Sequence, residues 1–229
     1  MSFRISSLRS SFAASVILLA AVVTPALAQS TYPSFQQPRV VNREFNFAIA
    51  AGSDITPLVF QWREHTAPGT QLSLDLGVAD PDFADDLFLM IGGQYASVLT
   101  RSRADMPLDI LFTAGLFTQF GNDLTFLSVP AGVSVGHRFP LSGTSMAITP
   151  YVHPRISLDY GKFGGDSETD VSITFDLGGN LELTSQLALR VSAMLGGDGI
   201  LGDSDAIGFS LAWTPRGLST TSSAPLPPR

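Results

Sequence analysis

The stretch Met146-Ala-Ile-Thr-Pro-Tyr-Val-His-Pro-Arg-Ile-Ser-Leu-Asp-Tyr160 changes side-chain character at every residue. Its even positions are apolar or aromatic, whereas threonine, histidine, arginine, serine and aspartate all fall on odd positions. Successive side chains of a β-strand point to opposite faces of the sheet. The period of two therefore predicts a strand whose two faces meet different surroundings.

The same period recurs along most of the chain, and the 3.6-residue period of a helix is absent after residue 43. We predict ten strands, over residues 44–52, 57–64, 71–79, 86–99, 107–120, 125–139, 145–160, 170–184, 187–197 and 205–214. The strand over 57–64 has the weakest pattern. If it and a neighbour are loops, the count falls to eight. Both totals are even, as in bacterial single-chain membrane barrels.

Composition restricts the class of protein. Only 14% of the 229 residues are charged, and Lys162 is the sole lysine, so the chain lacks the charged surface of a soluble domain. The net charge of -7 argues against nucleic acid as a partner. The chain has no cysteine and three scattered histidines, which predicts neither a metal site nor any other cofactor.

The content of the polar face indicates which face points outward. A lipocalin-like soluble barrel would place its apolar face inside and its polar face in water. Here the polar face is rich in Gly, Ser, Thr and Ala and carries only occasional charges, which suits a crowded lumen. We therefore expect the apolar face to meet lipid, where no strand edge can stay open. The predicted fold is all-β: a closed antiparallel transmembrane up-and-down β-barrel.

The N-terminus resembles an export signal. Arg4 and Arg9 precede an apolar run over 12–23, and Pro25-Ala-Leu-Ala28 supplies a small-residue cleavage pattern. The run is shorter than the roughly 20 residues of a membrane-spanning helix. We expect a signal peptide over 1–28 cleaved after Ala28, a periplasmic linker over 29–43, the barrel over 44–214, and a disordered Ser-, Thr- and Pro-rich tail over 215–229.

Loop lengths and charges give the barrel an orientation. The turn at Ser185-Gln186 is short, whereas the connections over 161–169 and 198–204 are longer and carry acidic residues. Bacterial barrels have short periplasmic turns and longer outer loops. We therefore expect the acidic end to face outward and an arginine-rich end, which includes Arg101 and Arg103, to face the periplasm.

Two sets of candidate residues follow from the strand phases. Charged and polar side chains on the inward phase predict a lumen polar cluster: Asp109, Arg138, Tyr151, His153, Arg155, Asp159, Asp176, Glu182 and Arg190. Because charges in a narrow barrel must pair, we expect Arg138, Arg155 and Arg190 to bind Asp109, Asp159, Asp176 or Glu182. Aromatic residues near the inner interface predict a girdle: Phe45, Trp62, Phe139 and Trp213.

Three segments resemble small outer-membrane β-barrel proteins of the porin-like superfamily. The run Val129-Pro-Ala-Gly-Val-Ser-Val-Gly-His-Arg-Phe139 resembles their P-x-G-x-x-x-G-x-x-F strand, and Thr149-Pro-Tyr-Val152 resembles the strand that follows it. The stretch Ile207-Gly-Phe-Ser-Leu-Ala-Trp213 resembles their C-terminal insertion signal. The resemblance implies insertion by the barrel-assembly machinery, although such signals usually end the chain and here 214–229 follow.

Catalysis and calcium binding are the alternatives to a structural role. His153 and Ser157 resemble the His and Ser of outer-membrane lipid A deacylases, but those lie two residues apart on a lipid-accessible surface, whereas here the separation is four on an inward face. The Gly- and Asp-rich loop over 196–205 lacks the bidentate Glu of an EF-hand. We therefore expect no catalysis and no metal.

The sequence predicts a small, monomeric barrel of the cell outer membrane with a structural or surface-interaction role. Its expected partners are outer-membrane lipid and lipopolysaccharide. A barrel of eight or ten strands is filled or nearly filled by its side chains, whereas aqueous channels need about 16. The alternative is a narrow conduit for a small solute, and a lipid-modifying enzyme comes third.

Overall fold

The computed structural model describes residues 32–82, 86–121, 124–196, 198–199, 202–203 and 205–215. Ten long strands form one sheet: β1 (Arg43–Gly52), β2 (Ile55–Ala67), β3 (Thr70–Pro81), β4 (Phe88–Thr100), β5 (Asp109–Gly121), β6 (Leu124–Gly136), β8 (Ala147–Phe163), β9 (Asp166–Glu182), β10 (Leu187–Leu195) and β13 (Ala206–Trp213). Three two-residue strands complete the set: β7 (Phe139–Pro140), β11 (Asp198–Gly199) and β12 (Gly202–Asp203).

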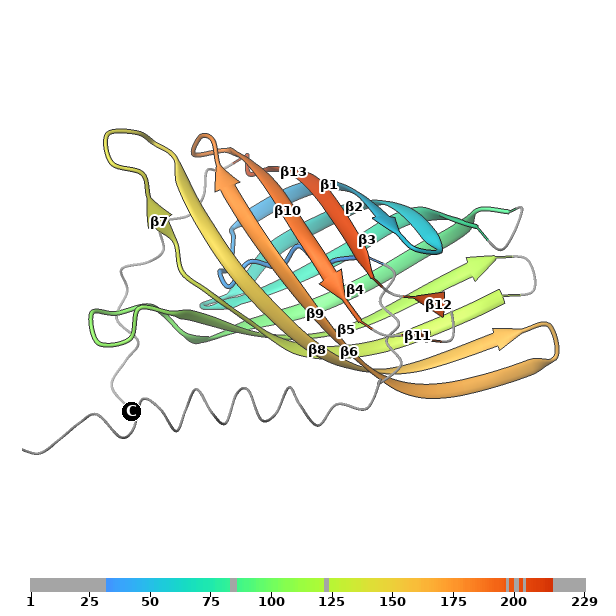
Figure 1. Ribbon diagram of the computed structural model, residues 1–229. Coiled ribbons are helices and arrows are strands. Elements are labelled where there is room, and N and C mark those ends of the chain that lie inside the picture. Colours follow the sequence, from blue (N-terminus) through green and yellow to red (C-terminus); the bar gives the residue numbers. More distant parts are fainter. Residues whose placement is uncertain are drawn as a thin grey trace, which may run out of the picture.

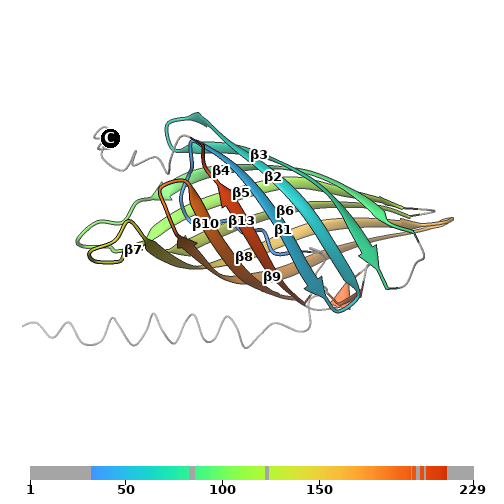
Figure 2. The same ribbon diagram turned by 90° about the horizontal axis from the view of Figure 1, so that it is seen from above.

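The sheet closes on itself. Each long strand pairs antiparallel with the next along the chain, and β1 pairs with β13 from Phe45↔Trp213 to Gly52↔Ala206. Figures 1 and 2 show the resulting ring of tilted strands from two directions. The prediction of a closed, antiparallel, ten-stranded barrel is confirmed. In the part of the chain that the structure describes, no helix is long and apolar enough to cross a bilayer.

The strand with the weakest sequence pattern is a full member of the barrel. β2 pairs with β1 through seven residues and with β3 along almost its whole length. Its inward face begins with the apolar Pro57 and Val59, and its outward face carries the charged Glu64, so the contrast between the two faces is weak in the sequence. The alternative of eight strands is thereby excluded.

Two predicted boundaries differ from the structure. The expected strand over 125–139 is broken at His137 and Arg138, and its end forms the separate β7, which pairs with the start of β8. The expected loop over 161–169 is instead a continuation of β8 and β9, which pair as far as Phe163↔Asp166 around Gly164 and Gly165. In Figure 1 this hairpin extends far beyond the neighbouring β10.

The outer face of the barrel is apolar. Along β8, the outward residues Val152, Ile156 and Leu158 are 43–53% exposed, whereas the intervening His153 and Asp159 are fully buried. Other strands show the same split, with large exposed side chains that include Phe47, Leu58, Leu76, Leu116, Phe175, Leu189, Phe209 and Leu211. The alternation predicted from the sequence is therefore the alternation between the exterior and the lumen.

The lumen is filled by two layers of side chains. Toward the end where the β1–β2 turn lies, an apolar core fills it: Ala48, Ala50, Ile55, Val59, Ala79, Phe88, Met90, Leu124 and Phe126. The other layer is polar and is built around residues 32–42, which precede β1 and run inside the ring of strands (Figure 1). The sequence placed these residues in a periplasmic linker; the structure places 32–38 and residue 41 among the buried residues.

Candidate functional site: the polar lumen

The N-terminal segment, defined as residues 32–42, provides the centre of the polar lumen. Phe35 is completely buried and is the one non-glycine residue with a left-handed backbone among the described residues, at φ 50°. Its ring tip lies 2.6 Å from the position that a Cβ on Gly208 of β13 would take, so only glycine leaves room for it. The barrel wall is thus shaped to receive this ring.

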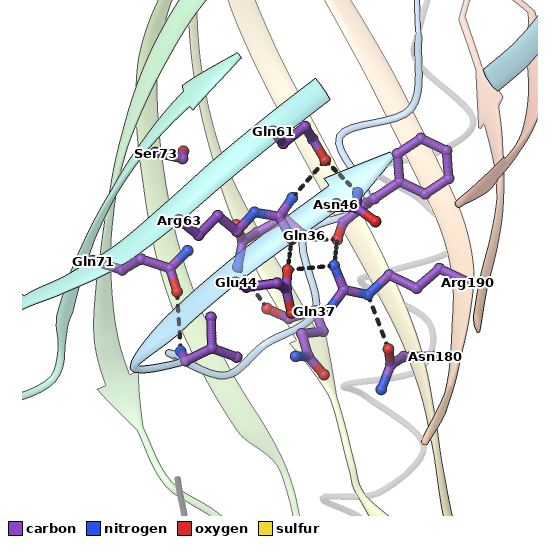
Figure 3. A network of polar contacts seen from close by, with 12 residues as sticks. Gln36, Gln37, Glu44, Asn46, Gln61, Arg63, Gln71, Ser73, Asn180 and Arg190 are labelled. Carbon is purple, nitrogen blue, oxygen red and sulfur yellow. Dashed lines mark hydrogen bonds and ion pairs between the residues drawn. The ribbon is translucent and has the colours of Figure 1, made fainter. Parts of the chain in front are cut away.

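A carboxylate between two arginines holds one side of the N-terminal segment. Glu44 of β1 accepts hydrogen bonds from Arg63 of β2 at 2.9 Å and from Arg190 of β10 at 2.6 and 2.7 Å. Figure 3 shows these side chains converging from three strands. Arg63 also donates to the Ser34 carbonyl at 2.9 Å and to the Phe35 carbonyl at 3.2 Å. The one carboxylate of Glu44 faces two guanidinium groups, and carbonyl oxygens of the segment provide further hydrogen-bond acceptors for Arg63.

A second carboxylate holds the other side of the segment. Asp176 of β9 accepts from Arg155 at 2.9 Å and from the Ser34 hydroxyl at 2.7 Å. The Ser34 hydroxyl also lies 2.7 Å from Nδ1 of His153, and Thr113 lies 2.9 Å from Nε2. Both ring nitrogens of His153 are therefore engaged. All five side chains are buried, so this network is enclosed by the barrel wall.

The hydrolase-like pair from the sequence is not assembled. Ser157 bonds to Ser172 at 2.5 Å and to Asp159 at 3.0 Å, and it makes no hydrogen bond to His153. The hydroxyls that do contact His153, on Ser34 and Thr113, are 7% and 1% exposed. General-base catalysis requires a nucleophile that a substrate can reach. The arrangement instead satisfies buried polar groups.

The remaining predicted residues lie at the arginine-rich end or along the wall. Arg138 binds Glu182 through Nε and Nη2 at 2.5–3.0 Å, and these hydrogen bonds raise the pKa of its guanidinium. Asp109 accepts from the Ser102 backbone at 2.9 Å and forms no ion pair with a described residue. The ring of Tyr151 fills the space over Gly178.

The expected pairings are found in two cases of three. Arg138 binds Glu182 and Arg155 binds Asp176, but Arg190 binds Glu44, which lay outside the expected set. Sequence reasoning also missed Arg63 and Ser34. The alternation could have identified Glu44 and Arg63, because Glu44 lies on the same inward face as Asn46, and Arg63 on the same inward face as Gln61. The segment before β1 has no alternation, and nothing in it signalled Ser34.

Three of the predicted girdle residues, Phe45, Trp62 and Trp213, lie side by side on neighbouring strands, and Phe139 lies apart from them. Phe45 is the cross-strand neighbour of both Trp213 and Trp62, and its ring centroid lies 5.6 Å from that of Trp213. Trp62 and Trp213 are 39% and 49% exposed on the outer face. Phe139 lies apart, on β7, where it pairs with Ile148.

The described residues contain no group of three or more His, Cys, Asp or Glu side chains that could hold a metal ion. Five charged side chains of the lumen pair with one another, and Arg63 and Asp176 also bind the N-terminal segment: Glu44, Arg63, Arg155, Asp176 and Arg190. What the arrangement does chemically is to neutralise charge inside a closed wall and to hold residues 32–41 in place.

Comparison with known proteins finds distant structural similarity to outer-membrane proteins, with TM-scores below 0.5. No family model and no curated protein matches the chain. A bacterial polysaccharide outer membrane secretin is 11% identical with a TM-score of 0.47, over 70% of this chain and 57% of its own. LpxR from Salmonella typhimurium is 12% identical with a TM-score of 0.43, over 80% and 78%. A NanC porin is 8% identical with a TM-score of 0.36, over 75% and 98%.

The chain thus spans little more than half the length of the secretin. Likenesses this distant carry no ligand, reaction or partner over to this protein.

Proposed function

We propose that this chain is a monomeric, filled β-barrel of the outer membrane with a structural or surface-interaction role in the cell envelope and no catalytic activity. The observation that carries the proposal is the combination of an apolar exterior with an occupied lumen. An apolar belt around a soluble barrel would be exposed to water at high cost, whereas lipid accommodates it.

The closed hydrogen bonding of the wall supports membrane insertion. Within the bilayer every backbone N–H and C=O must find a partner inside the protein, and only helices and closed barrels achieve this. The β1–β13 pairing provides closure here. The stacked Phe45 and Trp213 rings lie on the outer face near one end of the barrel, where aromatic residues favour the membrane interface.

The content of the lumen supports a filled barrel over a conduit. Residues 32–41 and the Glu44 ion pairs occupy the polar layer between the strands, and the apolar core occupies the other. A solute would have to displace buried charges whose partners would then be lost, at a cost of about 3–5 kcal/mol for each broken pair.

The proposed partners follow from this location. Lipid acyl chains would contact the apolar belt, and lipopolysaccharide would surround the acidic end, where the β8–β9 hairpin carries Asp166 and Glu168. The barrel-assembly machinery would bind β13 during insertion. Export would use the signal peptide cleaved after Ala28, which lies outside the described residues.

Conductance tests the filled lumen. Purified protein is reconstituted into planar bilayers in 1 M KCl (about 3 Å screening length, so that surface charge does not mask conduction), with a general porin as the positive control. The proposal predicts a flat baseline after verified insertion. Steady single-channel steps would contradict it and would favour the narrow conduit.

A further inference from the structure

A cavity in the lumen is not explained by the proposed role. It has a volume of about 30 Å³ and lies between the N-terminal segment and the apolar core, on the side formed by β2 to β6. Tyr32 and Ser34 of the segment and Arg155 of β8 also line it. This volume exceeds the roughly 10–15 Å³ that one water molecule needs, so a group of two or three heavy atoms fits.

The cavity contains a buried carboxylate oxygen without a partner. Asp75 of β3 is 5% exposed, and its Oδ2 accepts from the Tyr32 hydroxyl at 2.8 Å and from Gln61 at 2.9 Å. Its Oδ1 accepts no hydrogen bond, and Asp75 forms no ion pair with any described residue. Glu44 and Asp176, by contrast, are each neutralised by arginine. A buried carboxylate that forms no ion pair is costly, and a cation bound at its free oxygen would relieve that cost.

Gln94 and Ser128 are two of the neutral oxygen-bearing side chains that line the cavity with Asp75. Gln94 of β4 and Ser128 of β6 are 8% and 4% exposed, and neither side chain makes a hydrogen bond to a described residue. Each offers an acceptor oxygen. With Asp75 they provide three acceptors, one of them charged, which matches the three N–H donors of a primary ammonium group.

The rest of the lining distinguishes an organic cation from an inorganic one. Val59, Met90, Phe117 and Phe126 form an apolar wall. The Phe117 ring lies over Gly92 and meets Tyr32 edge to face, with centroids 6.3 Å apart. A sodium or calcium ion needs oxygen ligands on most sides, and this wall supplies none. An alkylammonium places its carbon atoms against such a wall and gains from the aromatic faces near its charge.

We infer that the lumen cavity binds a small primary alkylammonium, whose NH₃⁺ group donates to Asp75 Oδ1, Gln94 Oε1 and Ser128 Oγ while its carbons pack on the apolar wall. Binding involves no reaction. It is independent of conduction, because a site in a closed lumen can fill and empty without forming a continuous path.

Calorimetric titration of the full-length protein in detergent micelles tests this inference. Ethylammonium chloride is titrated against a blank of equal sodium chloride concentration. The expected result is saturable binding at one site with a millimolar Kd, weakened at least tenfold by Asp75→Asn. Ser128→Ala, which removes one neutral acceptor, should weaken binding several-fold. Asp166→Asn, at the exposed hairpin tip, is the matched control and should bind as the wild type does.

Three results would overturn the inference: no saturable heat above the sodium chloride blank, equal binding by Asp75→Asn, or equal competition by sodium ions. A folded barrel migrates differently on a gel before and after boiling in detergent, and retention of this heat-modifiable shift verifies that each variant is folded. If Asp75→Asn fails this check, Ser128→Ala and Gln94→Leu decide the question, and unchanged binding in both would contradict the site.

Discussion

Charge compensation in the lumen depends on single side chains. Glu44 is fully buried between Arg63 and Arg190, which are each 2% exposed. Removing one member of such a group leaves the others charged and without water. The energetic importance of Glu44 therefore lies mainly in what its loss would expose.

Glu44→Gln should be strongly destabilising. The neutral amide cannot balance two buried guanidinium groups, so the free energy of unfolding should fall by about 3–5 kcal/mol. Urea unfolding in micelles, followed by tryptophan fluorescence, measures the change.

Glu64→Gln is the matched control. Glu64 pairs with Arg43 at 2.6 Å, but both side chains are partly exposed, so its loss should leave the unfolding free energy nearly unchanged. Equal effects of the two substitutions would contradict the role assigned to Glu44.

A methyl group at Gly208 should displace the N-terminal segment. The new Cβ would lie 2.6 Å from the Phe35 ring, so Gly208→Ala should cost about 1–3 kcal/mol and speed tryptic cleavage after Arg39. Gly179→Ala, where the nearest atom is 4.0 Å away, is the control and should change neither property. Unaltered protease resistance in Gly208→Ala would show that the ring is not held there.

At the scale of single residues, the sequence predicted which face of the barrel wall a side chain occupies but not which side chain it pairs with. The period of two placed His153, Arg155, Asp159 and Asp176 correctly on the inward phase. Which charges meet depends on the strand order around the barrel: Arg190 and Glu44 are 146 residues apart and become neighbours only because β13 lies between β10 and β1. No local pattern contains that information.

At the scale of the element, β8 shows most clearly the contrast between an apolar outer face and a polar face toward the lumen. Outward Val152 is 43% exposed near the middle of the strand, and Tyr160 is 38% exposed toward its far end. If the strand spans a bilayer, the loss of folding free energy caused by a charged side chain on this face must depend on the depth of that side chain in the membrane.

Val152→Arg should therefore destabilise the barrel by about 2–4 kcal/mol, and Tyr160→Arg by about 0–1 kcal/mol. Unfolding in phospholipid vesicles measures both. Equal small costs at the two positions would indicate an outer face in water.

Element boundaries were harder to predict than the elements themselves. The sequence predicts a connection over 161–169, yet both arms continue pairing up to Phe163↔Asp166, and Gly164 adopts a positive φ of 55° at the turn. Outside the barrel wall, hydrogen bonding between strands no longer requires an apolar face, so the alternation that marks a strand disappears before the strand ends.

At the scale of the whole molecule, closure and filling are separate properties. Closure follows from ten alternating segments, and it could be predicted from the sequence. Filling by residues 32–42 could not, because this stretch has neither period nor charge run, and its burial depends on a lumen that exists only after the strands have met. The segment is held through its backbone carbonyls and through the side chains of Tyr32, Ser34 and Phe35, and such isolated contacts leave little trace in a sequence.

The location of the outer face in lipid is the central claim, and spin-label accessibility in vesicles tests it most directly. The chain has no cysteine, so single cysteines at Ile148, Val152 and Ile156 and, as a reference, at Ser167 of the hairpin tip give unique labels. The account predicts that labels at the three β8 positions are relaxed by oxygen and shielded from a water-soluble nickel chelate, while Ser167 shows the reverse. Nickel relaxation at Val152 equal to that at Ser167 would contradict a membrane-spanning barrel.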